Sequence, residues 1–234
     1  MKIIYDKKIN AYVIPKSGQE SAGKGMELEQ FNTLNFKDRV FMDIGACAGL
    51  VSKMAIEKGA KEVICLEPFS TNLEVLKLNV PSAIIIPKAV VDTGGPEEIQ
   101  FYSATSGHLG IGSIIPPKPG KKHLRNEPIM VKTIEFKELL ELYRPEVIKM
   151  DIEGSEFDII NEPLPDYVQE FHCEFHIFFR DDRILKFWKK FCYEWFPSNE
   201  WKVILPPVWP KNDRIIKSFS GMNVTRMAWR RKNK

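Results

Sequence analysis

The chain has 234 residues, of which 44% are hydrophobic and 28% are charged, so its composition excludes a disordered protein. Its 34 basic and 31 acidic residues give a net charge of +3, which is too mild to indicate a nucleic-acid partner by itself. The four cysteines stand apart, at positions 47, 65, 173 and 192, and argue against a disulfide framework or a structural zinc site. Neither a signal-peptide core nor a membrane-spanning apolar run is evident, so we expect one domain over residues 1–234, no membrane contact and a cytoplasmic location.

The first half of the chain predicts strands that alternate with helices. Residues 1–35 are interpreted as a peripheral lid, with a Gly/Ser-rich loop before a short helix. After it, short β-branched runs alternate with amphipathic stretches, which is typical of βαβ units around a parallel sheet. The predicted strands of this part are 40–44, 63–67 and 83–87.

The regular alternation then breaks at residues 92–130, which are rich in Gly, Pro and Ser and predict an inserted flap. We expect flap strands at 99–102 and 129–133, and a helix that Thr133 caps and that continues to residue 143. The later segments predict strands at 147–151, 168–175, 201–205 and 222–229, and helices at 155–160 and 183–196.

A turn rich in small residues follows the strand 40–44. Gly45 and Gly49 bracket it, and ligands of doubly wound sheets bind at such strand ends, where small residues let the backbone approach closely. Asp43 would place a carboxylate there that suits an ammonium group. Glu67 ends the next strand and could accept both hydrogen bonds of a ribose diol.

Two cofactor classes compete for this pattern. The dinucleotide motif G-x-G-x-x-G fails because Cys47 and Leu50 occupy glycine positions, and Asp43 would repel a pyrophosphate. S-adenosylmethionine has an ammonium, a carboxylate and a ribose diol but no phosphate, and fits better; a structural corner without a ligand is the alternative. Cys47 is interpreted as a small filler rather than a nucleophile. The predicted cofactor contacts are Asp43, Gly45, Ala46, Cys47, Gly49, Glu67, Pro68, Phe69, Ala89 and Val90.

A second group of polar residues lies at later strand ends. Asp151 and Glu153 share one side of their strand, and Glu174 and His176 share one side of the next. We predict that Asp151, Glu153 and His176 are catalytic and that Glu174 also lines the acceptor site, with His176 or a carboxylate as general base. Solvated strand ends are one alternative. A divalent metal bridging Asp151 and Glu174 is another, although a site without metal is favoured.

Three motifs resemble those of the FkbM-type class I methyltransferases. They are D-I-G-A-C-A-G at 43–49, L-E-P-F at 66–69 with the downstream Asn79, and V-I-K-M-D-I-E-G-S-E at 147–156. The resemblance covers about residues 36–180, and Cys47 replaces the family's usual Asn. It implies a Rossmann-like α/β fold with helices on both faces of a seven-stranded, mostly parallel sheet that ends in an antiparallel hairpin. It also implies S-adenosylmethionine as methyl donor and a hydroxyl oxygen as the usual acceptor.

The acceptor is less constrained than the donor. We expect a hydroxylated small molecule or a glycan, and the oligomeric state is open. The alternatives are a non-catalytic cofactor-binding module and an RNA methyltransferase that would use two basic clusters. The clusters are Lys118, Lys121, Lys122, His123 and Arg125 in the flap, and Arg226, Arg230, Arg231, Lys232 and Lys234 near the end of the chain.

Overall fold

The computed structural model describes residues 2–15, 26–103, 112–116, 127–178, 196–205 and 222–232. The predicted helix 183–196 and the basic cluster of the flap, 118–125, fall almost wholly outside these ranges. Within them, no helix is long and apolar enough to cross a bilayer.

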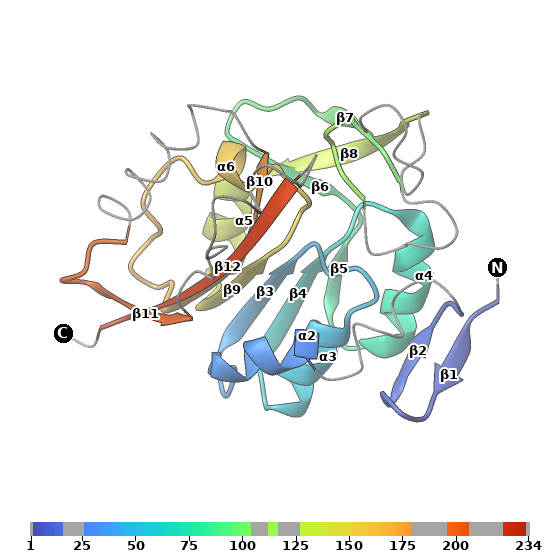
Figure 1. Ribbon diagram of the computed structural model, residues 1–234, viewed down its shortest axis with the longest axis horizontal. Coiled ribbons are helices and arrows are strands. Elements are labelled where there is room, and N and C mark those ends of the chain that lie inside the picture. The colour runs from blue at the N-terminus through green and yellow to red at the C-terminus, as the bar shows by residue number, and fades with distance from the viewer. Residues whose placement is uncertain are drawn as a thin grey trace, which may run out of the picture.

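A seven-stranded sheet forms the centre of the fold, in the order β11-β12-β10-β9-β3-β4-β5 (Figure 1). The five strands from β10 to β5 run parallel, whereas β12 is antiparallel to both β10 and β11. The prediction of a mostly parallel sheet is confirmed, as are the two closing strands. The strands are β3 (Val40–Ile44), β4 (Glu62–Leu66), β5 (Ile84–Ile86), β9 (Val147–Met150), β10 (Glu170–Phe178), β11 (Trp201–Leu205) and β12 (Met222–Arg231).

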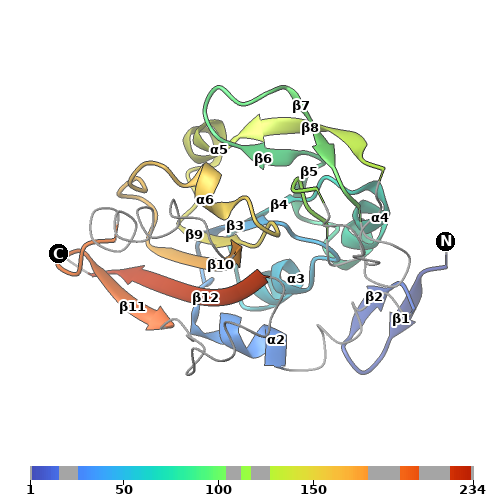
Figure 2. The same ribbon diagram turned by 45° about the horizontal axis from the view of Figure 1, so that its top comes forward.

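Helices cover both faces of this sheet because successive strand residues point to opposite sides. Phe41 packs in a core with residues of α3 and α4, whereas the adjacent Met42 packs in a core with residues of α5 and α6. Figure 2 shows the sheet between α5 and α6 on one side and α2 and α3 on the other. The helices are α2 (Met26–Glu29), followed by the 3-10 helix Gln30–Thr33, then α3 (Leu50–Glu57), α4 (Ser70–Asn79), α5 (Phe136–Tyr143) and α6 (Glu156–Ile159).

Two smaller sheets flank the centre. The flap strands β7 (Glu98–Phe101) and β8 (Ile129–Glu135) pair as predicted, and β8 also pairs with β6 (Ala89–Val91). The predicted cap at Thr133 is wrong, because Thr133 pairs within β8 and the helix begins only at Phe136.

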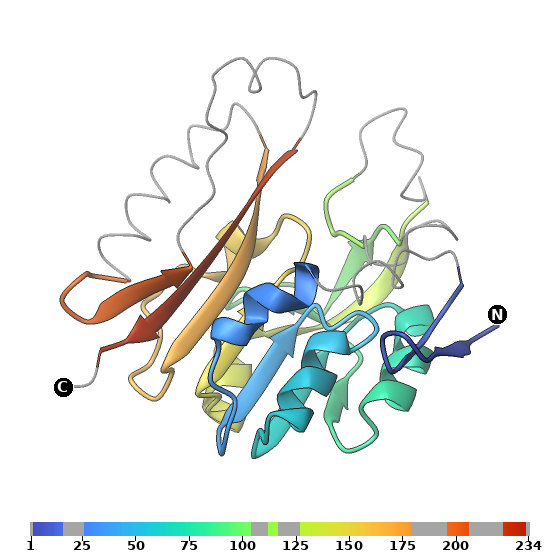
Figure 3. The same ribbon diagram turned by 60° about the horizontal axis from the view of Figure 1, so that its bottom comes forward.

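The N-terminal segment contains a hairpin that the sequence patterns did not reveal. Its strands are β1 (Ile4–Asp6) and β2 (Ala11–Val13), which pair antiparallel. The hairpin lies beside α4, as Figures 1 and 3 show. The short helix predicted after the Gly/Ser-rich loop is present as α2 and the turn of 3-10 helix that follows it.

Candidate active site

The turn between β3 and α3, residues 45–49, is called the cofactor turn after its predicted role. Its shape depends on glycine, because Gly45 and Gly49 both have φ of +78°. A Cβ added to Gly45 would lie 1.8 Å from the main-chain oxygen of Asp151, and one added to Gly49 would lie 2.5 Å from Leu76 Cδ1. The two glycines therefore let the cofactor turn approach both the end of β9 and helix α4.

Glu67 lies against this turn, at the end of β4. Its Oε2 accepts a hydrogen bond from the Cys47 N–H at 2.9 Å and its Oε1 accepts one from the Phe69 N–H at 2.8 Å. Burial raises the pKa of Glu67 to about 7, against the opposing effect of these two hydrogen bonds and of a third from the Asn72 side chain. A carboxylate has about four acceptor sites, so one site remains for a hydroxyl of the ribose diol.

Asp43 has different partners from the one expected. Its side chain is only 1% exposed; Oδ1 lies 3.2 Å from Lys149 Nζ, and Oδ2 accepts a 2.6 Å hydrogen bond from Ser52. Lys149 also donates to the Gly45 carbonyl at 2.7 Å. Burial lowers the pKa of Lys149, but the carboxylates of Asp43 and Asp151 outweigh this effect and raise it above its usual value. Asp43 thus holds the lysine that supports the cofactor turn, which differs from the predicted contact with the cofactor ammonium.

Apolar side chains form a wall beside the cofactor turn. Phe69 and Ala89 belong to one buried cluster with Ala48, and Cys47 packs against it. Val90, predicted together with Ala89, packs instead in the core shared with α5. Ala46 is buried and Pro68 is half-buried.

The thiol of Cys47 is held in its protonated form. Burial, followed by the charge of Glu67, raises the pKa of this thiol to about 12. This protonation agrees with the interpretation of Cys47 as a filler.

Asp151 and Glu153, which follow β9, are brought together with Glu174 and His176, which lie in β10 just beyond its pairing with β9, and we call the four residues the acceptor cluster. His176 Nε2 lies 3.2 Å from Glu153 Oε2 and 3.9 Å from Glu174 Oε1. Asp151 Oδ2 lies 3.8 Å from Lys149 Nζ, so the lysine that supports the cofactor turn also faces this cluster. The predicted proximity of these residues is confirmed, although their roles stay predictions.

Glu156 is a further member of the site, and the sequence patterns did not predict it as a site residue. Its side chain is fully buried, and its Oε1 lies 2.9 Å from His176 Nδ1. The same oxygen accepts hydrogen bonds from the N–H groups of Ile152, at 3.2 Å, and Gly154, at 3.1 Å. The motif E-G-S-E at 153–156 could have indicated this role, because it places a second acidic residue, Glu156, within about one helical turn of the end of the strand.

The carboxylate of Glu156 determines the protonation of His176. Burial lowers the pKa of His176, but the hydrogen bond and the negative charge of Glu156 raise it to about 10. A protonated imidazole donates hydrogen bonds and cannot accept a proton. Of the two general-base candidates, the raised pKa of His176 therefore favours a carboxylate over this histidine.

Glu153 occupies a constrained loop. Its φ is +60°, and its carbonyl accepts a 2.7 Å hydrogen bond from Ser113 Oγ of the flap. Burial raises the pKa of the Glu153 carboxyl, His176 opposes this effect, and Asp151 and Glu174 add to it. The flap thus contacts the acceptor cluster through a described residue.

The cluster also offers a donor set for a divalent cation. One ligand atom each from Asp151, Glu153 and His176 lie within 4.8 Å of one another. Imidazole and carboxylate suit several divalent metals, and Glu156 would orient the imidazole. This set differs from the predicted pair of Asp151 and Glu174, and a metal would have to displace the proton of His176.

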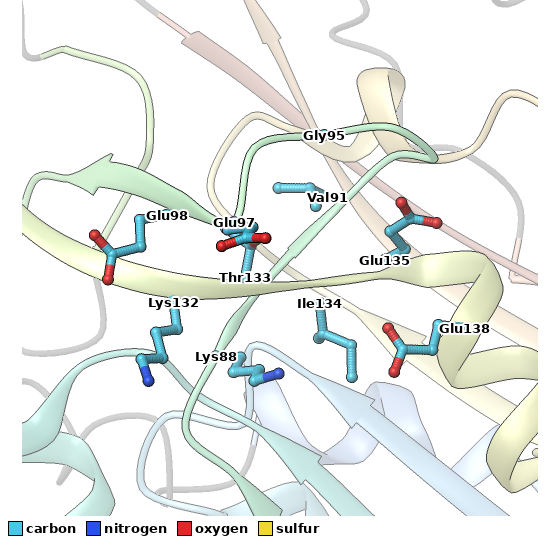
Figure 4. Close-up of a pocket in the computed structure, with 10 residues that line it drawn as sticks. All are labelled: Lys88, Val91, Gly95, Glu97, Glu98, Lys132, Thr133, Ile134, Glu135 and Glu138. Carbon is cyan, nitrogen blue, oxygen red and sulfur yellow. The ribbon is translucent and has the colours of Figure 1, made fainter.

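A separate hollow of about 660 Å³ lies over β6 and β8 (Figure 4). Its lining belongs neither to the cofactor turn nor to the acceptor cluster, so we place the candidate site at the strand ends and not here. The lining residues are Lys88, Val91, Gly95, Glu97, Glu98, Lys132, Thr133, Ile134, Glu135 and Glu138.

Comparisons with solved structures find chains of 10–15% identity, among them the following three. TrmK of M. capricolum, solved with S-adenosyl-homocysteine, is 10% identical, with a TM-score of 0.46 over 89% of this chain and 69% of that one. The ribosomal protein L11 methylase of Lactobacillus delbrueckii subsp. bulgaricus is 11% identical, with a TM-score of 0.45 over 95% and 82%. A dimethyladenosine transferase of Plasmodium falciparum is 11% identical, with a TM-score of 0.47 over 89% and 62%.

A comparison with curated proteins found no match. The model of the methyltransferase FkbM domain matches residues 43–193, which are more than half of the chain and include both the cofactor turn and the acceptor cluster. The chain therefore belongs to the FkbM family of methyltransferases, whose methyl donor is S-adenosylmethionine.

Proposed function

We propose that this protein transfers a methyl group from S-adenosylmethionine to a hydroxyl oxygen of a small or sugar-like acceptor. The observation that carries the proposal is the contact between the two halves of the site. Gly45 of the cofactor turn lies so close to Asp151 that a Cβ there would lie 1.8 Å from the Asp151 carbonyl oxygen. A donor bound at the turn would therefore present its methyl group beside the carboxylates of the acceptor cluster.

We assign the parts of the donor to the groups that match their chemistry. The ribose diol goes to Glu67, whose carboxylate faces the cofactor turn. The adenine goes to the apolar wall that Phe69 and Ala89 share. The methionine portion goes to the main chain of residues 45–49, which Lys149 supports through the Gly45 carbonyl.

The reaction needs alignment and removal of one proton. The sulfonium is already activated, so catalysis consists of holding the acceptor oxygen in line with the methyl group and accepting its proton. Asp151 is the most exposed carboxylate of the cluster, at 29%, against 19% for Glu153 and 12% for Glu174. We assign Asp151 to orient and deprotonate the acceptor hydroxyl, and the protonated His176 to stabilise the surrounding carboxylates.

The basic end of the chain gives limited support to the RNA alternative. Arg230 Nε lies 2.8 Å from Glu170 Oε1. Arg231 lies 3.2 Å from Glu200 Oε2 and stacks 4.3 Å from the centre of the Trp201 ring. These guanidinium groups are engaged within the fold, which favours an acceptor that needs no basic surface.

The test compares Asp151→Asn with Asp38→Asn in methyl transfer from labelled donor to fractionated cell extract. Asp38 is an exposed carboxylate with φ of +59°, a conformation that Asn tolerates, so it serves as the matched control. We expect Asp151→Asn to lower turnover by roughly 100-fold or more while calorimetric affinity for S-adenosylmethionine stays unchanged. Unchanged turnover would refute the role of Asp151.

The same experiment distinguishes the alternatives. Label recovered in small hydroxylated compounds supports the proposal. Label in RNA, with filter binding that weakens steeply as salt increases, supports the RNA methyltransferase. A protein that binds the donor but labels no fraction is the non-catalytic module.

A further inference from the structure

The N-terminal hairpin, which precedes the matched family region 43–193, is joined to helix α4 by an amide side chain. The Tyr12 N–H donates to Asn79 Oδ1 at 2.7 Å, and Asn79 Nδ2 donates to the Tyr12 carbonyl at 3.0 Å. Asn79 thus binds both main-chain groups of one residue of β2, as a neighbouring strand would. Asn79 is the last residue of α4, beside which the hairpin lies (Figure 3).

The same amide also holds the cofactor turn. Asn79 Nδ2 donates a second hydrogen bond, of 2.8 Å, to the Ala48 carbonyl. A primary amide has two N–H donors, and both are used here, one toward the hairpin and one toward the turn. Asn79 is only 8% exposed, so solvent competes little for these hydrogen bonds.

A second contact links the hairpin to the site through apolar packing. Ile14, which follows β2, is 7% exposed and belongs to the cluster that contains Ala48, Phe69 and Ala89. This cluster is the wall to which we assigned the adenine. The N-terminal segment therefore reaches the cofactor site twice, through the amide of Asn79 and through the side chain of Ile14.

The cofactor turn needs support from outside because Cys47, a non-glycine residue within it, has an unfavourable backbone conformation. Gly45 and Gly49 both have positive φ, and so does Cys47 between them, at +50°. A non-glycine residue in this region is held there only by its surroundings. The hydrogen bond from Asn79 to Ala48 acts on the residue directly after Cys47.

We propose that residues 2–15 are an integral part of the S-adenosylmethionine site, and that Asn79 is the positioning residue that links them to the cofactor turn. This inference rests on the proposed placement of the donor at that turn. According to this proposal, donor binding and the docking of the hairpin stabilise each other, because both require the same conformation of Ala48.

The variant Asn79→Asp tests the link with almost no change in volume. It replaces the NH₂ group by a carboxylate oxygen that faces the carbonyls of Tyr12 and Ala48, so two hydrogen bonds become repulsive contacts. We expect the dissociation constant for S-adenosylmethionine, measured by calorimetry, to rise roughly tenfold or more. Asn32→Asp is the control, since Asn32 is exposed and its Oδ1 accepts from Lys58, which an Asp oxygen also does.

Hydrogen exchange of the unchanged chain tests the same link without a substitution. We expect S-adenosylmethionine to slow exchange both in residues 45–49 and in residues 4–13. Protection of 45–49 alone, or donor affinity unchanged in Asn79→Asp, would overturn the inference while leaving the donor site in place. An unchanged chain that does not bind S-adenosylmethionine would instead overturn the proposed function.

Discussion

The cofactor turn and the acceptor cluster lie next to each other but are built in different ways. The turn is shaped by the main chain, since its glycines have positive φ and the Glu67 carboxylate accepts hydrogen bonds from backbone N–H groups. The acceptor cluster is shaped by side chains, since His176 is held by Glu156 on one nitrogen and faces Glu153 on the other. The main-chain geometry of the cofactor turn suits one ligand, whereas the side chains of the acceptor cluster can be substituted.

The two regions also differ in charge. Under the cofactor turn, Asp43 is paired with Lys149, so the buried charges balance. In the acceptor cluster, several carboxylates surround one imidazole, and Glu156 and Glu153 raise its pKa. This difference is consistent with a donor site that must be rigid and an acceptor site that must move a proton.

Gly45→Ala should have the largest effect because it disrupts both regions at once. The added Cβ would lie 1.8 Å from the Asp151 carbonyl oxygen, so the cofactor turn and the β9 loop would have to separate. We expect a loss of more than about 3 kcal/mol in the free energy of unfolding and no detectable donor binding. Urea unfolding and calorimetry measure the two effects.

Gly94→Ala is the control for this variant. Gly94 has φ of +77°, almost the same as Gly45, but no atom lies within 4 Å of the added Cβ. It should cost only about 1 kcal/mol, the strain of the backbone alone. Equal losses in the two variants would contradict the importance of the close approach.

How well sequence patterns predicted each part of the site depends on whether its contacts join residues that are close or distant in the sequence. The strand 40–44, its glycine turn and Glu67 follow from residues that are close in the sequence, so local patterns sufficed. The pairing of Asp43 with Lys149 depends on β3 and β9 being neighbours, which no local pattern reveals. Local patterns therefore missed the ion pair with Lys149, whereas the contact of Asp43 with the cofactor ammonium stays a prediction.

The acceptor cluster was predicted from the rule that every second residue of a strand points to the same side of the sheet. The rule was applied to two parallel strands that end at the same edge. Asp151 and Glu153 do lie beside His176, but they follow the end of β9 at Met150, so the predicted alternation along a strand is wrong for them. Strand alternation also gave no information on Glu156, which reaches His176 from a helix. It also gave none on the N-terminal hairpin, whose place depends on one amide of α4. Whether a polar side chain such as Glu156 or Asn79 is buried depends on such packing between segments that are distant in the sequence.

Glu156→Gln should have the next largest effect, confined to the acceptor cluster. Glutamine keeps an oxygen for the Ile152 and Gly154 N–H groups but removes the charge that raises the pKa of His176. We expect the titration midpoint of the His176 ring, followed by proton NMR among the four histidines, to fall by at least about one unit, and turnover to fall roughly tenfold. Glu98→Gln, on an exposed side chain of β7, should change neither quantity.

The contact between Glu156 and His176 also predicts how the free energy of unfolding depends on pH. Because folding raises the pKa of His176 from 6.5 to about 10, the folded state binds the extra proton between these values. The stabilisation is complete below pH 6.5 and is lost as the pH rises through about 10. The free energy of unfolding should thus decrease over this range more in the unchanged chain than in Glu156→Gln.

Donor affinity should depend on pH through Glu67, with a smaller effect. The carboxyl group has its pKa raised to about 7, and its ionised form is the stronger hydrogen-bond acceptor for the ribose diol. Affinity for S-adenosylmethionine should therefore increase by up to about tenfold between pH 6 and pH 8. Calorimetry at pH 7 in buffers of different ionisation enthalpy should show that binding releases protons, and absence of release would exclude this role of Glu67.

Metal chelation should have the smallest effect. The ligand atoms of Asp151, Glu153 and His176 lie within 4.8 Å of one another and could hold a cation. However, the pKa of His176 is raised to about 10, so its ring already carries a positive charge among these carboxylates at neutral pH. We therefore expect exhaustive treatment with EDTA to change turnover less than about twofold. If turnover were instead lost and restored by Mg²⁺ or Mn²⁺, the metal would have to replace the proton of His176, and metal affinity would then increase with pH.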